Sequence, residues 1–210
     1  MSFKLIVTKL NISNKKFITS HEIKDYCRVL NLDYYYTIRY LTHYRYLIRI
    51  FKGIFYIPSI EERKFDKTDM NYFEIIKNGL IIKGVKKWYF GLETALKLNN
   101  MTHEYFTIDY VVNDSIFRAK PITILGHKVK FIKLTPKLVS FGIKENNINY
   151  SNPEKTILDM FYLKRCNKTE LLELSEKLSK TKLVKYSKYY SKKVKKIVKE
   201  LYSKYYNKNS

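Results

Sequence analysis

Residues 17–58 decide the fold of this chain and read FITSHEIKDYCRVLNLDYYYTIRYLTHYRYLIRIFKGIFYIP. A first helix is expected to begin at Thr19 or Ser20, because Thr19 and Glu22 have the T-x-x-E spacing of a capping box. In that motif each of the two side chains accepts a hydrogen bond from a backbone N–H at the helix start. Helical spacing then predicts one buried stripe, formed by Ile23, Tyr26, Cys27 and Leu30.

A second helix is expected after a break at Asn31-Leu32, with Asp33 as its N-cap. Helical spacing divides this second helix into two faces. The inward face is predicted to contain Tyr35, Ile38, Leu41 and Thr42. The outer face is predicted to carry Tyr36, Arg39, Tyr40 and His43.

A β-hairpin is predicted next, because residues 47–51 and 54–57 are rich in β-branched and aromatic residues around Lys52-Gly53. Residues 1–10 can supply a leading helix that completes a three-helix core. Helix, turn, helix and hairpin together indicate a winged helix-turn-helix, whose second helix lies in a DNA major groove while the wing touches the backbone. The same pattern also suits a small protein-interaction module, which is the alternative.

The residues expected to contact DNA lie on the second helix, just after it, and on the hairpin. They are Tyr34, Tyr36, Thr37, Arg39, Tyr40, His43, Arg45, Arg49 and Lys52. Arg39 is the best candidate for reading a base, because a guanidinium can bond both major-groove acceptors of guanine.

The charge balance favours a polyanionic partner. The 210 residues include 41 Lys and Arg against 19 Asp and Glu, which gives a formal net charge of +22 and a pI near 9.7. Such a surface attracts nucleic acid or anionic lipid. The sequence has no apolar run of membrane-spanning length and no signal peptide, so a cytoplasmic protein is expected. Cys27 and Cys166 are too isolated to indicate a disulfide framework or a zinc site.

The predicted fold class is α+β, with an N-terminal winged helix-turn-helix, then a mixed α+β domain and a basic C-terminal helical tail. Four segments are expected along the chain. They are a DNA-binding domain at 1–60, a charged linker at 61–67, an α+β domain at 68–165 and the tail at 166–210.

The tail combines an apolar stripe, which is expected to dock on the protein, with a one-sided set of lysines. Those expected to contact phosphates are Lys185, Lys188, Lys192, Lys195, Lys196 and Lys199. Lysines on flexible stems suit sequence-independent phosphate contacts, so double-stranded DNA is the expected partner. A membrane-surface helix is the lesser alternative.

No catalytic or metal-binding constellation is found, and no cofactor is expected. The sequence contains no G-x-x-x-x-G-K-[ST], G-x-G-x-x-G, H-E-x-x-H or G-x-S-x-G motif. A metal-dependent nuclease is the main enzyme alternative, and it needs an acid-x-Lys triplet on a strand beside a second acid. The triplets Glu22-Ile23-Lys24 and Glu62-Arg63-Lys64 fall at a helix start and in the predicted linker, so a protein without enzymatic activity is expected.

Three segments, in their order and spacing, resemble the AbiE-type antitoxins, the repressor half of prokaryotic type IV toxin–antitoxin pairs. They read RIFKGIFYIP at 49–58, YFGLETAL at 89–96 and SNPEKTILD at 151–159, and the likeness covers most of the chain to about Leu163. The resemblance implies a repressor of its own two-gene operon, whose second domain helps to neutralise a nucleotidyltransferase-like toxin encoded beside it. A stand-alone winged-helix transcriptional regulator is the alternative.

Overall fold

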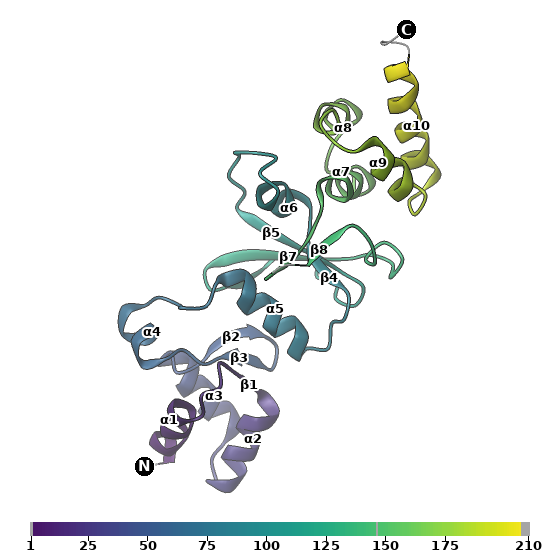
Figure 1. Ribbon diagram of the computed structural model, residues 1–210. Coiled ribbons are helices and arrows are strands. Elements are labelled where there is room, and N and C mark those ends of the chain that lie inside the picture. Colours follow the sequence, from purple (N-terminus) through teal and green to yellow (C-terminus); the bar gives the residue numbers. More distant parts are fainter. Residues whose placement is uncertain (1, 146, 207–210) are drawn as a thin grey trace. The chain divides into compact units, whose positions relative to one another are not determined.

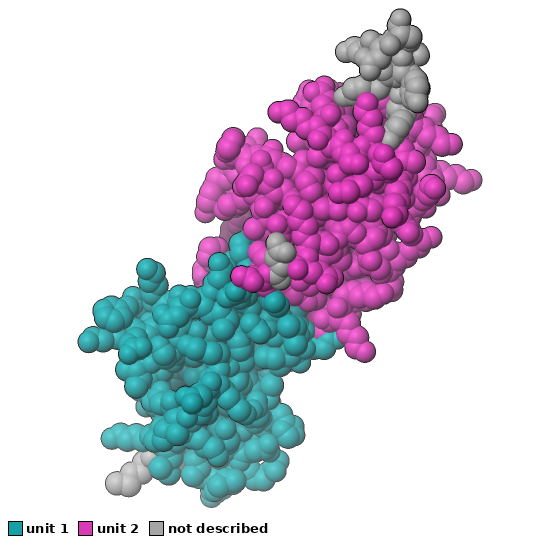
Figure 2. Space-filling model, in the orientation of Figure 1, with its two compact units in different colours: residues 1–84 teal, residues 85–210 magenta. Residues whose placement is uncertain are grey.

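The computed structural model describes residues 2–145 and 147–206. The chain forms two compact units, Met1–Gly84 and Val85–Ser210 (Figure 2). Each unit has its own hydrophobic core. The fold is α+β, as the sequence predicts, with N-terminal helices beside a small antiparallel sheet, a six-stranded mixed sheet, and C-terminal helices (Figure 1).

The first unit contains the winged helix-turn-helix. Its helices are α1 (Ser2–Ile12), α2 (Ser20–Val29), α3 (Tyr34–His43), α4 (Ile60–Phe65) and α5 (Tyr72–Ile82). Its strands are β1 (Phe17–Thr19), β2 (Ile48–Phe51) and β3 (Ile54–Tyr56), in the spatial order β1-β3-β2. Both pairings are antiparallel, with Ile18 opposite Phe55, and Gly53 takes a φ of +80° in the hairpin turn. Strand β1 adds a third strand that the sequence did not suggest.

The core of the first unit joins α1, α2 and α3 to the sheet. It contains Ile6, Leu10, Ile18, Ile23, Cys27, Ile38, Leu41, Leu47, Phe55 and Ile57. The predicted leading helix is therefore confirmed as the third member of the helical core.

The predicted linker, residues 61–67, is instead mostly helix α4, and the first unit extends beyond it. Ser59 caps α4 in a capping box with Glu62, whose side chain is buried. Helix α5 then packs on β2 and β3. A Cβ atom on Gly79 would lie 2.7 Å from the ring of Phe51, so the close approach of α5 requires glycine. The boundary between the units lies at Gly84, not at residue 60.

The second unit is built on a six-stranded sheet. Its strands are β4 (Trp88–Phe90), β5 (Ile108–Asn113), β6 (Ile122–Ile124), β7 (His127–Lys133), β8 (Ile143–Glu145) and β9 (Asn149–Ser151), in the order β6-β7-β5-β4-β9-β8. The pairs β5–β7 and β4–β9 are parallel and the others are antiparallel. Within residues 85–145 and 147–206, five helices complete the second unit. They are α6 (Leu92–Leu98), α7 (Pro153–Tyr162), α8 (Lys168–Ser175), α9 (Lys180–Ser187) and α10 (Lys192–Tyr206).

The described part of the predicted tail belongs to the core of this second unit. Leu183, Tyr190 and Val194 are buried in the same cluster as Tyr89 of β4 and Leu158 of α7. The apolar stripe therefore docks, as expected, but the segment is not a separate appendage; residues 207–210 lie outside the described range. Among the described residues, no helix is both long enough and apolar enough to cross a bilayer.

Candidate nucleic-acid interface

Helix α3 is fixed in place by local hydrogen bonds that the sequence predicts. The Asp33 carboxylate accepts a 2.7 Å hydrogen bond from the backbone N–H of Tyr36 and so caps the helix. Helix α2 begins with the predicted capping box, in which the Thr19 N–H donates to Glu22 at 2.9 Å. Ile38 is buried on the inner side of α3, which leaves the opposite side of the helix free to face a ligand.

The outer face of α3 carries Tyr36, Arg39 and His43, all exposed. Tyr40 lies at its edge and is half-buried, because its ring stacks on Phe3 of α1 at a centroid distance of 4.7 Å. Phe3 also lies 5.6 Å from the ring of Tyr36. These aromatic contacts brace α3 against α1 and hold the outer face in a defined orientation.

Two residues of α3 lie on the opposite side from the one predicted. Thr37, expected to contact DNA, is completely buried, and its hydroxyl donates a 2.6 Å hydrogen bond to the Asp33 carbonyl. Tyr35, expected inside, is 79% exposed. Tyr34 is half-buried, and its hydroxyl donates to Ser20 Oγ at 2.8 Å, so it ties α3 to α2. Tyr35 therefore takes the place of Thr37 among the groups available to a ligand.

The basic residues after α3 differ in how much of their charge is available. Arg45 forms an ion pair with Asp66 at the end of α4, which compensates part of its charge. Arg49 is exposed on β2, with its guanidinium 5.6 Å from the ring centroid of Phe55. Lys52 is exposed in the turn of the hairpin. The hairpin thus presents two cations, Arg49 and Lys52, as the wing of such a domain needs.

A buried carboxylate, Glu62, holds the hairpin to α4. The hydroxyl of Tyr56 donates to Glu62 Oε1 at 2.5 Å, the Asp69 N–H donates to the same oxygen at 2.8 Å, and Lys16 lies 3.3 Å from Oε2. Burial alone would raise the pKa of Glu62, but hydrogen bonds from Ser59, Tyr56 and Asp69 outweigh it and lower that pKa to about 2. Burial and the nearby carboxylate raise the pKa of Tyr56.

The six lysines of the predicted phosphate-contacting set are all exposed. They are Lys185, Lys188, Lys192, Lys195, Lys196 and Lys199, on α9, just after it, and on α10. The apolar sides of these two helices are buried in the core of the second unit. Positive charge is therefore concentrated on the sides that face solvent.

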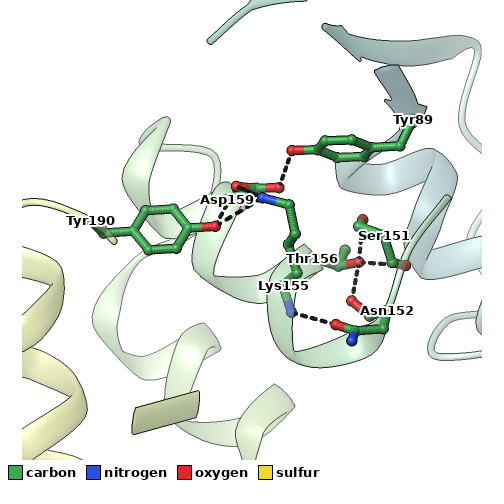
Figure 3. A network of polar contacts seen from close by, with 7 residues as sticks. All are labelled: Tyr89, Ser151, Asn152, Lys155, Thr156, Asp159 and Tyr190. Carbon is green, nitrogen blue, oxygen red and sulfur yellow. Dashed lines mark hydrogen bonds and ion pairs between the residues drawn. The ribbon is translucent and has the colours of Figure 1, made fainter. Parts of the chain in front are cut away.

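A buried polar network attaches these lysine-bearing helices to the sheet (Figure 3). Lys155 and Asp159 lie one turn apart on α7, are fully buried, and form an ion pair with Nζ 3.1 Å from Oδ1. Tyr89 of β4 donates to Asp159 Oδ2 at 2.7 Å, and Tyr190, between α9 and α10, donates to Oδ1 at 2.6 Å. The Lys155 ammonium also lies 4.4 Å from the ring centroid of Phe141.

Burial sets the protonation chemistry of this network. It lowers the pKa of Lys155, although the Asp159 carboxylate works in the opposite direction. It raises the pKa values of Tyr89 and Tyr190 well above their ordinary range, and the nearby Asp159 raises them further. Both hydroxyls therefore stay protonated and act as donors to the carboxylate.

The segment 151–159 supplies both the ion pair of this network and the cap of the helix that carries it. Asn152 caps α7 by accepting a 3.0 Å hydrogen bond from the Lys155 N–H. Ser151 Oγ and Thr156 Oγ1 lie 2.7 Å apart beside it. The available signal for the ion pair was the i, i+4 spacing of Lys155 and Asp159. Their burial was not readable from the sequence.

The described carboxylates and histidines do not form a metal-binding cluster. Within residues 2–145 and 147–206, no three His, Cys, Asp or Glu side chains gather so as to hold a metal ion. Of the two acid-x-Lys triplets, Glu22 is engaged in the cap of α2 and Glu62 in the contacts that hold the hairpin.

Together these elements define an α+β protein with a winged helix-turn-helix in its first unit. No protein-family model matches the chain, and no curated protein matches it. One solved structure that is similar is the crystal structure of the Rv2827c protein from Mycobacterium tuberculosis. The TM-score is 0.60 at 10% sequence identity, over 95% of this chain and 75% of that one. At that identity the likeness concerns the fold.

Proposed function

We propose that this chain is a transcriptional repressor that binds double-stranded DNA with α3 in the major groove. The observation that carries the proposal is the outer face of α3, where Tyr36, Arg39 and His43 are exposed on a helix anchored by its N-cap. In a winged helix-turn-helix this face meets the base edges. Arg39 reads guanine, since its fork of donors matches the O6 and N7 acceptors.

Basic groups of the hairpin supply the phosphate contacts that position α3. Arg49 and Lys52 are exposed on the wing, which in this class of domain lies against the DNA backbone. Phosphate contacts fix register and orientation without reading sequence. The lysines of α9 and α10 form a second basic surface suited to phosphate contacts. The net charge of +22 favours phosphate binding by both surfaces.

We propose further that the second unit serves an antitoxin activity against a nucleotidyltransferase-like toxin. The support is the resemblance of segments 49–58, 89–96 and 151–159 to AbiE-type antitoxins, together with a separate core that DNA binding alone does not need. The protein is proposed to act without catalysis. The alternative is a stand-alone regulator in which the second unit has no toxin to counteract.

Sequence selection from a random DNA pool tests the DNA-reading assignment. The wild-type protein should select a defined site, and Arg39→Ala should lose the preference at one base position, worth roughly 1–3 kcal/mol. Arg118→Ala removes an exposed charge from the second unit and serves as the control, since it should leave every base preference unchanged. An equal loss of affinity for all sequences in Arg39→Ala would make Arg39 a phosphate contact instead.

Co-expression with the neighbouring gene tests the antitoxin assignment. The full-length protein should relieve growth arrest caused by a nucleotidyltransferase-like neighbour. The triple variant Arg39→Ala, Arg49→Ala, Lys52→Ala should still relieve it while no longer repressing the promoter. If no such neighbour exists, or if rescue disappears together with repression, the stand-alone regulator replaces the antitoxin.

A further inference from the structure

The basic surface of α9 and α10 contains an aromatic side chain that phosphate contacts alone do not need. Tyr189, in the turn between the two helices, is 40% exposed. Its ring stacks on Phe141, with the ring centroids 4.5 Å apart and the ring planes at 25° to each other. Phe141 covers one face of the Tyr189 ring, so the exposed surface of that ring includes the opposite face. The two stacked rings form an aromatic platform.

The aromatic platform is held in place from the interior of the second unit. Phe141 lies beside the buried network of Figure 3, because the Lys155 ammonium is 4.4 Å from the centroid of the Phe141 ring. Tyr190, whose hydroxyl bonds Asp159, also contacts Phe141 edge-on, with a centroid distance of 6.0 Å. The platform therefore exists before any ligand arrives, and binding does not have to order it.

Three exposed lysines lie around the platform. The Lys137 ammonium is 5.6 Å from the centroid of the Tyr189 ring, and Lys87 donates a 3.0 Å hydrogen bond to Ser140, next to the platform. Lys188 directly precedes Tyr189. Within the part of the chain that the structure describes, none of the three lysines forms an ion pair. Their charges are therefore available to phosphates.

An exposed ring distinguishes single strands from duplexes. In a duplex each base already stacks on its neighbours, and a protein reaches the face of a base only after extruding it, which costs free energy. Unpaired bases present their faces, and stacking on an aromatic side chain tolerates any sequence because every base has a π-face. Lysines alone would suit a duplex backbone equally well, so the ring is the feature that favours a single strand.

We propose that the second unit binds single-stranded nucleic acid at the aromatic platform. A base stacks on the open face of Tyr189, and the neighbouring phosphates bind Lys137, Lys87 and Lys188. Lys137 leaves the ring for a phosphate when the base stacks there. This chemistry is shared by RNA and DNA, since it consists of stacking and phosphate contacts. The proposal goes beyond the reading of duplex DNA by α3 and the antitoxin activity, and it depends on neither.

Equilibrium binding of fluorescent oligonucleotides tests the proposal. The parent protein is the full-length chain with Arg39→Ala, Arg49→Ala and Lys52→Ala, which removes the cations of α3 and the wing. The probes are a single strand of about 12 nucleotides, as RNA and as DNA, and a DNA duplex of the same length. Tyr189→Leu should weaken single-strand binding about 5- to 100-fold and leave duplex binding unchanged, because the lysines stay in place. The tighter of the two single strands identifies the polymer.

Two control variants isolate the contribution of the ring. Tyr189→Phe should bind as tightly as the parent, since a phenyl ring can stack on a base in the same way. Tyr105→Leu should also leave the affinity unchanged. Tyr105 is the matched control, because it is 84% exposed in the same unit, with the Lys97 ammonium 5.8 Å from its ring centroid, but lies outside the platform.

The salt dependence of binding separates the ring from the charges. Tyr189→Leu should keep the salt slope of the parent, because the ring neutralises no phosphate. Lys137→Gln tests the same site without changing the stacked rings, and it should weaken single-strand binding and lower the slope by about 0.7. Urea denaturation followed by the fluorescence of Trp88 establishes that each variant is folded under the binding conditions.

Any of four results would overturn the single-strand site. They are unchanged single-strand affinity in Tyr189→Leu, an equal loss for duplex and single strand in that variant, a Tyr189→Phe protein that binds as weakly as Tyr189→Leu, and an unchanged salt slope in Lys137→Gln. None of these results bears on the reading of duplex DNA, because the parent protein already lacks the cations of α3 and the wing.

Discussion

The hydroxyl of Tyr190 donates a 2.6 Å hydrogen bond to Oδ1 of the buried Asp159, and this contact joins the turn between α9 and α10 to helix α7. Tyr190→Phe removes the donor and should lower the free energy of unfolding by about 1.5–3 kcal/mol, as for hydrogen bonds to charged groups. Urea denaturation followed by the fluorescence of Trp88, the single tryptophan, measures this in the second unit.

Tyr189→Phe is the control for that measurement. Tyr189 is the neighbouring residue, is 40% exposed, and stacks on Phe141 at 4.5 Å, a contact that phenylalanine can keep. The control should change the free energy of unfolding by less than about 0.5 kcal/mol. Equal losses in the two variants would show that the Tyr190 hydroxyl contributes nothing specific.

Replacing Gly142 is predicted to lower the free energy of unfolding, because its backbone lies close to the side chain of Lys155. Its φ is +65°, and an added Cβ would lie 2.9 Å from Lys155 Cβ and 3.0 Å from Lys155 Cδ. Gly126 also has a positive φ, +82°, but an added Cβ there meets nothing within 4 Å. Gly126→Ala should therefore cost only the backbone strain, about 1–2 kcal/mol.

Gly142→Ala should cost that strain plus about 1–3 kcal/mol for overpacking. The same Trp88 fluorescence gives both values. A Gly142→Ala protein no less stable than Gly126→Ala would show that α7 moves aside freely.

Glu62 is predicted to make the first unit sensitive to acid. Its pKa in the folded protein is about 2, below the ordinary 4.5, so the folded state binds this proton more weakly than the unfolded state. The stability that Glu62 contributes is complete above pH 4.5 and is lost as the pH falls toward 2. Glu62→Gln does not titrate, so the stability difference between the wild type and this variant should shrink over that interval.

Hydrogen exchange of backbone amides in β3 measures this difference for the first unit alone. Other carboxylates titrate in both proteins and cancel in the comparison. A difference that stays constant down to pH 2 would remove Glu62 from the acid response.

DNA affinity is predicted to depend steeply on salt. If the protein neutralises about six to ten phosphates, its affinity should fall by about 10³–10⁵ between roughly 50 and 200 mM salt. Changing Lys185, Lys188 and Lys192 to Gln should make the slope shallower by about 0.9 for each phosphate that is no longer neutralised, with base preference unchanged. The charges must be removed in place, because Tyr190 and Val194 belong to the core and deleting the segment would open it.

Titrations at several salt concentrations give that slope. The control changes Lys67, Lys83 and Lys86 to Gln, three exposed lysines outside α9 and α10. Equal slopes in the two triple variants would mean that α9 and α10 do not touch DNA.

The protein is predicted to cleave neither DNA nor RNA in the presence of Mg²⁺ or Mn²⁺. The expectation follows from the sequence, whose acid-x-Lys triplets lie at a helix start and in the segment of α4. Gel assays of the purified protein measure it. Cleavage that persisted through purification and was abolished by Asp109→Asn or Asp114→Asn would support the nuclease instead.

Local signals explain why much of the first unit was predictable. The capping box of Thr19 and Glu22 and the cap at Asp33 act within one helical turn, so their spacing alone is informative. The same S-x-x-E spacing was present at Ser59 and Glu62, but the surrounding charges suggested a solvated linker. Burial of Glu62 depends on Tyr56 and Asp69, and no local pattern reveals those contacts.

Other features were not predictable from the sequence, either because the local pattern is ambiguous or because the contacts join segments that lie far apart in the chain. In a run of three tyrosines and a threonine, helical phase is ambiguous. Thr37 lies one turn before the buried Leu41 and is buried with it, and its hydroxyl is satisfied by the Asp33 carbonyl. Packing of α5 on the hairpin depends on how Gly79 meets Phe51. The pairing of Lys155 with Asp159 was visible as spacing, but its two tyrosine partners come from distant segments.

The core of the second unit includes Tyr190 and Val194, so it cannot close until the ribosome has delivered the chain through these residues. The core of the winged helix draws only on residues before Gly84 and can form much earlier in translation. A nonsense codon after Leu163 should therefore yield a product that still occupies its operator while its second unit is unfolded and exposed to proteases. Such alleles would separate the two proposed activities genetically, without any substitution at α3.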